Sequence, residues 1–351
     1  MRHDVATVAD LDGFDAVIDV RSPAEFAEDH VPGALSCPVQ DDEERARVGT
    51  LYKQVSPFAA RKVGAALVAA NIARHVEANF LEHPRQWRPL VYCWRGGKRS
   101  GSMTHVLREI GWAAQQLEGG YKSFRRHVIG ELDALASGLR FRVICGLTGS
   151  GKSRLLRALA DRGEPVLDLE AIAAHRGSVL GDLPREPQPS QKGFETQLWQ
   201  ALRKLDPARP VFVESESRKI GNLRVPESLM DRMHAGECVK IEADVSTRAE
   251  LLLEEYAHFF DDPARLEEKL RALTPLHGHR VVDRWVGHVT ARRWPDLVIE
   301  LLVDHYDPAY TRSIGGHYPA WHSVDAVTIA SPSPESFARA AGQIATENAR
   351  T

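Results

Sequence analysis

The chain has 351 residues, a formal net charge of -3 and 43% hydrophobic residues, which is the composition of an ordinary globular protein. This length is sufficient for two domains that each bury a core. The small net charge excludes a protein that holds nucleic acid through the field of the whole molecule, so a nucleic-acid partner would have to contact local basic patches.

The sequence predicts a protein of the reducing cytoplasm without a membrane partner. Its first residues lead into no apolar signal segment, and no uninterrupted apolar run is long enough to span a bilayer. The cysteines are scattered without paired spacing, which argues against a disulfide framework and against a zinc site. They are Cys37, Cys93, Cys145 and Cys238.

The first predicted elements are a strand over residues 16–21 and a helix that follows it. The strand is rich in β-branched residues, and Ser22 is a suitable N-cap for a helix with Pro23 at its first position and Glu25 three residues after the cap. We interpret the charged residues here as an ion-pair and capping network rather than as catalytic groups. They are Asp19, Arg21 and Glu25.

A cysteine loop lies between a predicted strand over residues 89–92 and a predicted helix over 103–109. Its sequence is Cys93-Trp94-Arg95-Gly96-Gly97-Lys98-Arg99-Ser100. Inward N–H groups and the cations Arg95, Lys98 and Arg99 would favour an anion at the centre and lower the pKa of Cys93. The loop therefore predicts a nucleophilic thiolate for sulfur, selenium or phosphorus; the alternative is a buried cysteine before a Gly-rich turn.

Residues 4–128 resemble the rhodanese domain family. The resemblance is carried by the first strand and helix, by the Cys93 loop and by a Gly-Gly motif within residues 117–124. The resemblance implies a doubly wound parallel sheet in which Cys93 carries a sulfur-like atom as a persulfide or perselenide. Five residues separate Cys93 from Arg99, one more than in common single-domain rhodaneses. This spacing also occurs in protein tyrosine phosphatases, which usually have His where Tyr92 stands here, so a phosphatase stays as an alternative.

A second domain is predicted to begin where a helix-like segment over residues 128–137 ends and a new strand starts at Arg140. We place the domains at residues 1–137 and 138–351. The second strand leads into Gly146-Leu147-Thr148-Gly149-Ser150-Gly151-Lys152-Ser153 and then a helix, the full phosphate-loop pattern in its strand–loop–helix context.

The phosphate loop predicts a polyphosphate ligand, whose identity the sequence leaves open. Its glycines let backbone amides approach the phosphates, Lys152 binds the outer phosphates, and Ser153 is a ligand for Mg²⁺. No tightly bound cofactor is expected, and Mg²⁺ is a candidate ion at the phosphate loop. The predicted phosphate-binding residues are Gly146, Gly149, Ser150, Gly151, Lys152 and Ser153.

Acidic residues follow a further apolar strand that begins at Pro210. In a phosphate-loop fold this strand lies beside the loop, so Glu214 or Glu216 is a candidate to orient a metal-bound water or bind a substrate hydroxyl. A solvated strand end explains them equally well. Downstream, we predict a strand over residues 239–243 and an amphipathic helix capped at Ser246 and running to Phe260.

Basic residues interleaved with aromatic ones suit an RNA backbone and splayed bases, although a solvated helical face with buried Trp is an equal alternative. Together with basic residues near the end of the first domain they form a predicted stripe across the domain junction. The candidate tRNA-binding residues are Lys122, Arg125, Arg126, Arg218, Lys219, Arg284, Arg292 and Arg293.

The order of the two domains and their motifs resembles the tRNA 2-selenouridine synthase family. The resemblance implies an α/β transferase that replaces the 2-sulfur of wobble 2-thiouridine in tRNA with selenium from selenophosphate, after S-geranylation from geranyl diphosphate. A selenophosphate-producing enzyme is then an expected partner. The implied catalytic residues are Cys93, Arg95, Lys98 and Arg99.

Two other functions remain open from the residues alone. One is a rhodanese-type sulfurtransferase, or a Cys-x5-Arg phosphatase, with a phosphate-loop regulatory domain. The other is a non-enzymatic sensor of sulfur or selenium that depends on a nucleotide.

Overall fold

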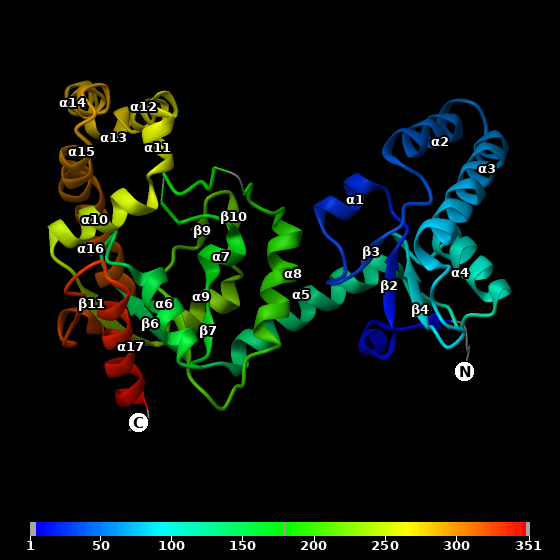
Figure 1. Ribbon diagram of the computed structural model, residues 1–351, viewed down its shortest axis with the longest axis horizontal. Helices are drawn as coiled ribbons and strands as arrows, with labels where there is room; N and C mark the ends of the chain where they lie inside the picture. Colours follow the sequence, from blue (N-terminus) through cyan, green and yellow to red (C-terminus); the bar gives the residue numbers. More distant parts are fainter. Residues whose placement is uncertain (1–4, 179, 185, 349–351) are drawn as a thin grey trace. The chain divides into compact units, whose positions relative to one another are not determined.

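The computed structural model describes residues 5–178, 180–184 and 186–348, which form two compact units. The first unit comprises residues up to Leu132 together with Pro189–Gln200, and the second comprises the rest. The predicted boundary at residues 137/138 falls at the end of helix α5 (Gly120–Gly138), whereas the packing changes units within that helix (Figure 1).

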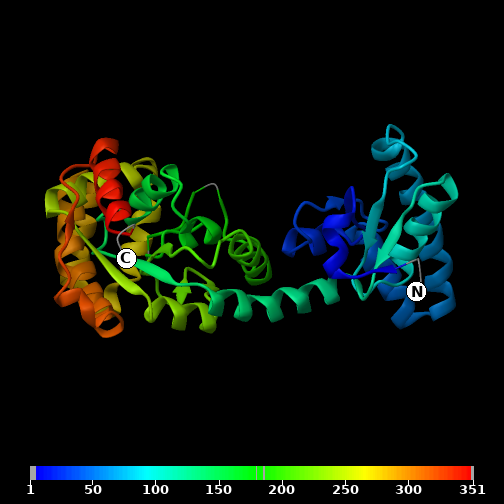
Figure 2. The same cartoon turned by 90° about the horizontal axis from the view of Figure 1, so that it is seen from below.

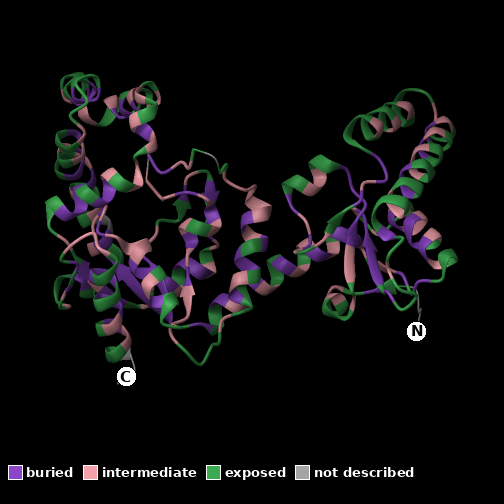
Figure 3. Ribbon diagram, viewed as in Figure 1, coloured by how far each residue is buried: buried purple, intermediate pink, exposed green. Residues whose placement is uncertain are grey.

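The first unit is built on a parallel sheet of five strands in the order β1-β5-β4-β2-β3. Ile18 pairs with Val91 at the centre of this sheet, and β4 is buried along its whole length (Figure 3). The strands are β1 (Val5–Ala6), β2 (Ala16–Asp19), β3 (Leu35–Ser36), β4 (Pro89–Tyr92) and β5 (Gln115–Leu117).

Helices α3 and α4 supply the side chains that pack on β2 and β4, with Met103 and Leu107 fully buried. Helix α1 begins at Pro23 as predicted, and the Ser22 N–H donates to the Glu25 carboxylate at 3.2 Å. The helices are α1 (Pro23–Glu28), α2 (Asp42–Gln54), α3 (Pro57–His75), α4 (Lys98–Ile110), α5 and α8 (Gln191–Leu202), with short helical turns at Val8–Gly13 and Val76–Phe80.

The second unit has its own parallel sheet of five strands in the order β12-β11-β6-β8-β7, and a separate β9–β10 hairpin. The two parallel sheets and their helices confirm the predicted α/β class. The strands are β6 (Phe141–Cys145), β7 (Val166–Leu167), β8 (Val211–Glu214), β9 (Lys219–Ile220), β10 (Leu223–Arg224), β11 (Glu237–Glu242) and β12 (Val327–Thr328).

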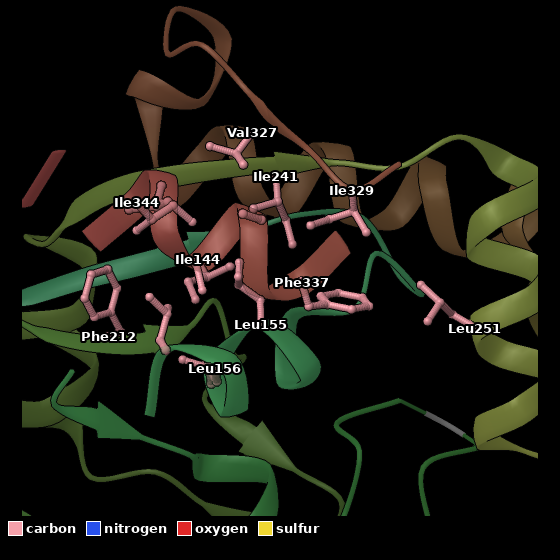
Figure 4. Close-up of a cluster of buried hydrophobic side chains, with 14 residues drawn as sticks. Ile144, Leu155, Leu156, Phe212, Ile241, Leu251, Val327, Ile329, Phe337 and Ile344 are labelled. Carbon is pink, nitrogen blue, oxygen red and sulfur yellow. The ribbon is translucent and has the colours of Figure 1, made fainter. Parts of the chain in front are cut away.

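The core of this unit lies between its sheet, helix α6 (Lys152–Asp161) and the last described helix, α17 (Pro334–Asn348) (Figure 4). Phe337 and Ile344 of α17 pack with Leu155 of α6 and Ile144 of β6, and the views in Figure 1 and Figure 2 both place α17 beside the sheet. The C-terminal segment therefore helps to hold the element that begins at the phosphate loop.

The remaining helices of the second unit follow its strands or form an all-helical segment between β11 and β12. They are α6 (Lys152–Asp161), α7 (Leu169–Ala173), α9 (Glu227–His234), α10 (Val245–Glu255), α11 (His258–Asp261), α12 (Pro263–Arg271), α13 (Thr274–His277), α14 (His279–Thr290), α15 (Trp294–Leu301) and α16 (Asp307–His317), with short turns at Leu302–Tyr306 and Pro319–His322.

The cap predicted at Ser246 is wrong by two residues. Asp244 is the N-cap of α10, since its carboxylate accepts the Thr247 N–H at 2.6 Å, while the Ser246 hydroxyl donates to the same carboxylate at 2.8 Å. A charged acceptor at a helix N-terminus outcompetes a neutral hydroxyl. The helix also ends at Glu255, and α11 is a separate turn.

Among the described residues, no helix combines the length and the apolar character that crossing a bilayer requires.

Candidate active site

The cysteine loop connects β4 to α4, which begins at Lys98. The Cys93 side chain is almost completely buried, with 3% of the residue exposed. Its Sγ accepts hydrogen bonds from the Gly97 N–H at 3.2 Å and from the Ser100 hydroxyl at 3.1 Å. The first turn of α4 therefore points donors at the sulfur.

These donors determine the ionisation of Cys93. Burial alone would raise the pKa of the thiol, but hydrogen bonds from the Ser100 side chain and from the backbone N–H groups of Ser100, Arg95 and Gly97 outweigh it. The net pKa of Cys93 is below its ordinary value. The loop thus favours a thiolate, which is the nucleophilic form of cysteine.

One of the three loop cations is engaged in an ion pair, and the other two lie at the surface. The Arg99 guanidinium lies 3.0 Å from the Glu25 carboxylate, which Arg45 also contacts at 3.2 Å. Arg95 and Lys98 are exposed. The lowered thiol pKa follows from the hydrogen-bond donors, and the interpretation of Glu25 as an ion-pair and capping residue is confirmed. A catalytic role for the three cations stays a prediction.

The Gly-Gly motif supports the back of the cysteine loop, a role that the sequence did not show. Gly120 has φ of +58°, and a Cβ there would lie 2.2 Å from the Cys93 carbonyl oxygen and 2.5 Å from the Gly96 nitrogen. The next residue, Tyr121, donates its N–H to the same carbonyl at 2.8 Å. Only glycine lets the start of α5 approach the loop so closely.

Gly120→Ala is expected to destabilise the first unit by about 3 kcal/mol, because Ala would adopt a left-handed conformation and clash with loop backbone. Urea unfolding measures this loss. The control is Gly130→Ala on the same helix, where a Cβ meets nothing within 4 Å and the exposed position favours Ala by up to about 1 kcal/mol. Equal stability of the two variants would show that position 120 does not require glycine.

Helix α8 packs on the first unit through a buried polar network. The Asp29 carboxylate accepts the Tyr121 hydroxyl at 2.8 Å and the Thr196 hydroxyl at 3.1 Å, and Arg125 forms an ion pair with Glu195. Because this guanidinium is only 11% exposed and already paired, the structure does not place Arg125 on an open basic surface. Its predicted tRNA contact is not supported by this geometry.

The phosphate loop connects β6 to α6, which begins at Lys152. Gly149 and Gly151 have φ of +76° and +80°, and a Cβ on Gly151 would lie 2.5 Å from the Phe337 ring. Lys152 Nζ donates to the Gly146 carbonyl at 3.1 Å and lies over the Tyr310 ring, 5.4 Å from its centroid. The Lys152 side chain therefore folds back onto the loop backbone.

A group of carboxylates lies beside this loop, with Glu214 buried and Glu170 half-buried. Oxygen atoms of Glu170, Glu214 and Glu216 lie within 4.8 Å of one another, and the Ser153 hydroxyl lies 2.9 Å from Glu170 and 3.3 Å from Glu214. Burial and the charge of Glu170 raise the pKa of Glu216 to about 8, and burial also raises those of Glu170 and Glu214. Such a cluster suits a divalent cation, which prefers oxygen ligands.

Sequence reasoning found Glu214 and Glu216 but missed Glu170. Glu170 lies on α7, directly after the two-residue strand β7, where an acidic residue in a first helical turn is unremarkable. A cavity of about 330 Å³ beside the loop brings together Lys152, Ser153, Glu170 and Glu214. Ser150 instead lines a different cavity, next to Arg248.

The other candidate tRNA-binding residues are exposed or paired on the surface, and they belong to two units, so the predicted stripe stays a prediction. Arg284 pairs with Glu300 at 2.7 Å and Asp304 at 2.8 Å, which favours the solvated-face alternative there. Arg218 lies 3.4 Å from Glu227 and Arg293 lies 4.0 Å from Asp296. The exposed residues are Lys122, Arg126, Lys219 and Arg292.

The folds and loops together define a protein that joins a rhodanese-like domain to a phosphate-loop domain. Residues 5–127 match the family model of the rhodanese-like domain, and residues 139–273 match that of the tRNA 2-selenouridine synthase AAA domain. The chain belongs to the tRNA 2-selenouridine synthase family, a family of tRNA-modifying enzymes, which confirms the resemblance seen in its motifs.

Three proteins named tRNA 2-selenouridine synthase show the extent of the similarity. That of Nitrosomonas europaea is 37% identical, over 86% of this chain and 77% of the relative. That of Alcanivorax borkumensis is 34% identical, over 84% and 88%. That of Aeromonas salmonicida is 33% identical, over 85% and 87%.

Proposed function

We propose that this protein replaces the 2-sulfur of wobble 2-thiouridine in tRNA with selenium from selenophosphate, through an S-geranyl intermediate formed from geranyl diphosphate. The observation that carries the proposal is a pair of loops with different functional groups. One presents the Cys93 thiol with its lowered pKa, and the other presents Lys152 beside a carboxylate cluster. The names of the relatives indicate that the reaction introduces selenium and that the substrate is tRNA.

The phosphate loop serves the alkylation step. The thiouridine sulfur attacks C1 of the geranyl group, the C1–O bond breaks, diphosphate leaves, and the uridine N3 proton is released to solvent. Lys152 and the loop amides stabilise the negative charge that grows on the leaving group. Alkylation turns the sulfur into a better leaving group for the next step.

The cysteine loop serves the selenium step, which can be written without any oxidant. The Cys93 thiolate takes the phosphoryl group of selenophosphate, which frees hydrogen selenide. The selenide attacks C2 of the S-geranyl uridine, and geranylthiol leaves. Water then hydrolyses the phosphocysteine to phosphate and free thiol. A perselenide on Cys93 would instead need an oxidant, because thiolate and selenophosphate are both fully reduced.

Mg²⁺ fits the carboxylate cluster, where Ser153, Glu170, Glu214 and Glu216 offer hard oxygen ligands. When bound, the ion would neutralise charge on the diphosphate. It would also favour ionised carboxylates, since burial otherwise holds their pKa values high.

The test is mass analysis of nucleosides from 2-thiouridine-containing tRNA incubated with the purified full-length protein. With geranyl diphosphate alone, S-geranyl-2-thiouridine is expected, and 2-selenouridine is expected once selenophosphate is added. Unmodified 2-thiouridine in both reactions, with sulfur transfer from thiosulfate to cyanide, would instead assign the protein as a sulfurtransferase.

A further inference from the structure

A second cavity adjoins the phosphate-loop cavity in the second unit, and its walls are almost entirely apolar. They come from α10, α11, α12 and α15, which Figure 1 shows gathered in the all-helical segment. The side chains used below are Leu252, Phe260, Leu266, Trp294 and Val298.

The two cavities share part of their lining. Thr148, Ser178, Leu252 and Tyr256 line both of them. Leu252 packs directly on the phosphate loop, since a Cβ on Gly149 would lie 2.9 Å from its side chain. A molecule with its diphosphate on the loop therefore has the apolar cavity within immediate reach.

Two of the polar groups at the shared rim are engaged with each other. The Ser178 and Tyr256 hydroxyls lie 3.2 Å apart, and burial raises the pKa of Tyr256 far above its usual range, so this phenol stays neutral. The residues that line the apolar cavity include no charged side chain, whereas Lys152, Arg157 and Arg176 line its neighbour.

This chemistry distinguishes between two kinds of phosphorylated ligand. The base and ribose of a nucleotide carry polar edges, and those edges would lose their hydrogen bonds to water in such a cavity. An unsaturated hydrocarbon chain has no polar edge, and it gains from leaving water. We propose that the apolar cavity holds the hydrocarbon chain of an acyclic allylic diphosphate whose diphosphate lies on the phosphate loop. This inference rests on the prenyl step proposed above.

The apolar cavity is too small to take a whole prenyl chain as it stands, so its walls must move apart around the chain and thereby limit the chain length. At about 50 Å³ it is much smaller than the 330 Å³ cavity beside it. Trp294 and Phe260 stack with ring centroids 4.8 Å apart, and they line only the apolar cavity. These two rings form the wall that a longer chain would have to displace.

The experiment compares two probes on the full-length protein by calorimetry in Mg²⁺ buffer: geranyl diphosphate and inorganic pyrophosphate. Val298→Phe fills the cavity, so the dissociation constant for geranyl diphosphate is expected to rise about tenfold or more, while that for pyrophosphate stays within about twofold. The control is Val303→Phe, at a position that is 51% exposed and outside the cavity lining, where neither constant should change.

A second variant tests the opposite change. Trp294→Ala enlarges the cavity, so farnesyl diphosphate is expected to gain about tenfold in affinity relative to geranyl diphosphate. The proposal is overturned if Val298→Phe weakens both probes equally or weakens neither. If the wild-type protein binds pyrophosphate but not geranyl diphosphate, the prenyl step of the proposed function fails. Binding of geranyl diphosphate that ignores Val298→Phe refutes the cavity assignment alone.

Discussion

Lys152→Ala is expected to slow geranyl transfer to 2-thiouridine by about a hundredfold or more, the scale of losing one preorganised charge at a leaving group. Lys152 Nζ now donates to the Gly146 carbonyl at 3.1 Å, so the ammonium lies inside the loop where a phosphate would bind. A neutral methyl group at this position leaves the departing diphosphate without its cation. The first step should fail while the fold survives, because the lysine supports no hydrophobic core.

The measurement separates the two steps. Wild-type and variant proteins are given 2-thiouridine RNA with geranyl diphosphate, or RNA that is already S-geranylated with selenophosphate. The variant should fail only in the first reaction, and Lys204→Ala, which removes an exposed lysine from the same unit, should fail in neither. Geranylation by Lys152→Ala at a rate within about tenfold of wild type would show that the loop does not hold the leaving group.

The phosphate loop was predictable because its signal is local. The strand, the glycines, the lysine and the helix follow one another directly in the sequence. Gly149 and Gly151 have the positive φ that only glycine adopts freely, as the motif predicts. The carboxylate cluster was predictable only in part. Glu214 ends strand β8 and Glu216 follows that strand, whereas Glu170 comes from helix α7, and only the parallel sheet brings their oxygens together.

The cysteine loop shows where counting charges in a sequence misleads. Arg95, Lys98 and Arg99 were expected to lower the thiol pKa because they are neighbours in the chain. Arg99 instead pairs with Glu25, which lies 74 positions away. Long-range pairing leaves no trace in a local pattern, whereas the N–H groups that act on the sulfur belong to every strand–loop–helix turn of this kind.

Helix α8 illustrates the same limit for domain assignment. This helix, which carries Trp199, lies in the sequence between β7 and β8, two strands of the second unit. Its packing on the first unit depends on Asp29 and Glu131, which accept hydrogen bonds from Thr196 at 3.1 Å and from Trp199 at 2.7 Å. An amphipathic pattern reveals that a helix has a buried face, but not which core covers it.

Cys93→Ala is expected to abolish conversion of S-geranyl-2-thiouridine to 2-selenouridine and to leave geranylation of 2-thiouridine unchanged. No other described cysteine is given hydrogen bonds from a helix start in this way, so no nearby thiol can replace it. Loss of a covalent nucleophile should lower the rate of the selenium step by about a thousandfold or more. Nucleoside mass analysis of the two separated reactions measures both outcomes.

Cys37→Ala is the matched control, because Cys37 is also a buried thiol of the first unit, but burial and Asp19 raise its pKa to about 11. This variant should slow neither geranylation nor the selenium step.

The chemical state of Cys93 is tested independently by Ser100→Ala, which removes a hydrogen-bond donor from the sulfur and so raises the thiol pKa. Alkylation of Cys93 by iodoacetamide near neutral pH should then be slower than in the wild type, because a smaller fraction is thiolate. If Cys93→Ala retains the selenium step, the thiol is not the group that takes the phosphoryl group of selenophosphate; if it loses both steps while remaining folded, the two loops do not divide the steps between them.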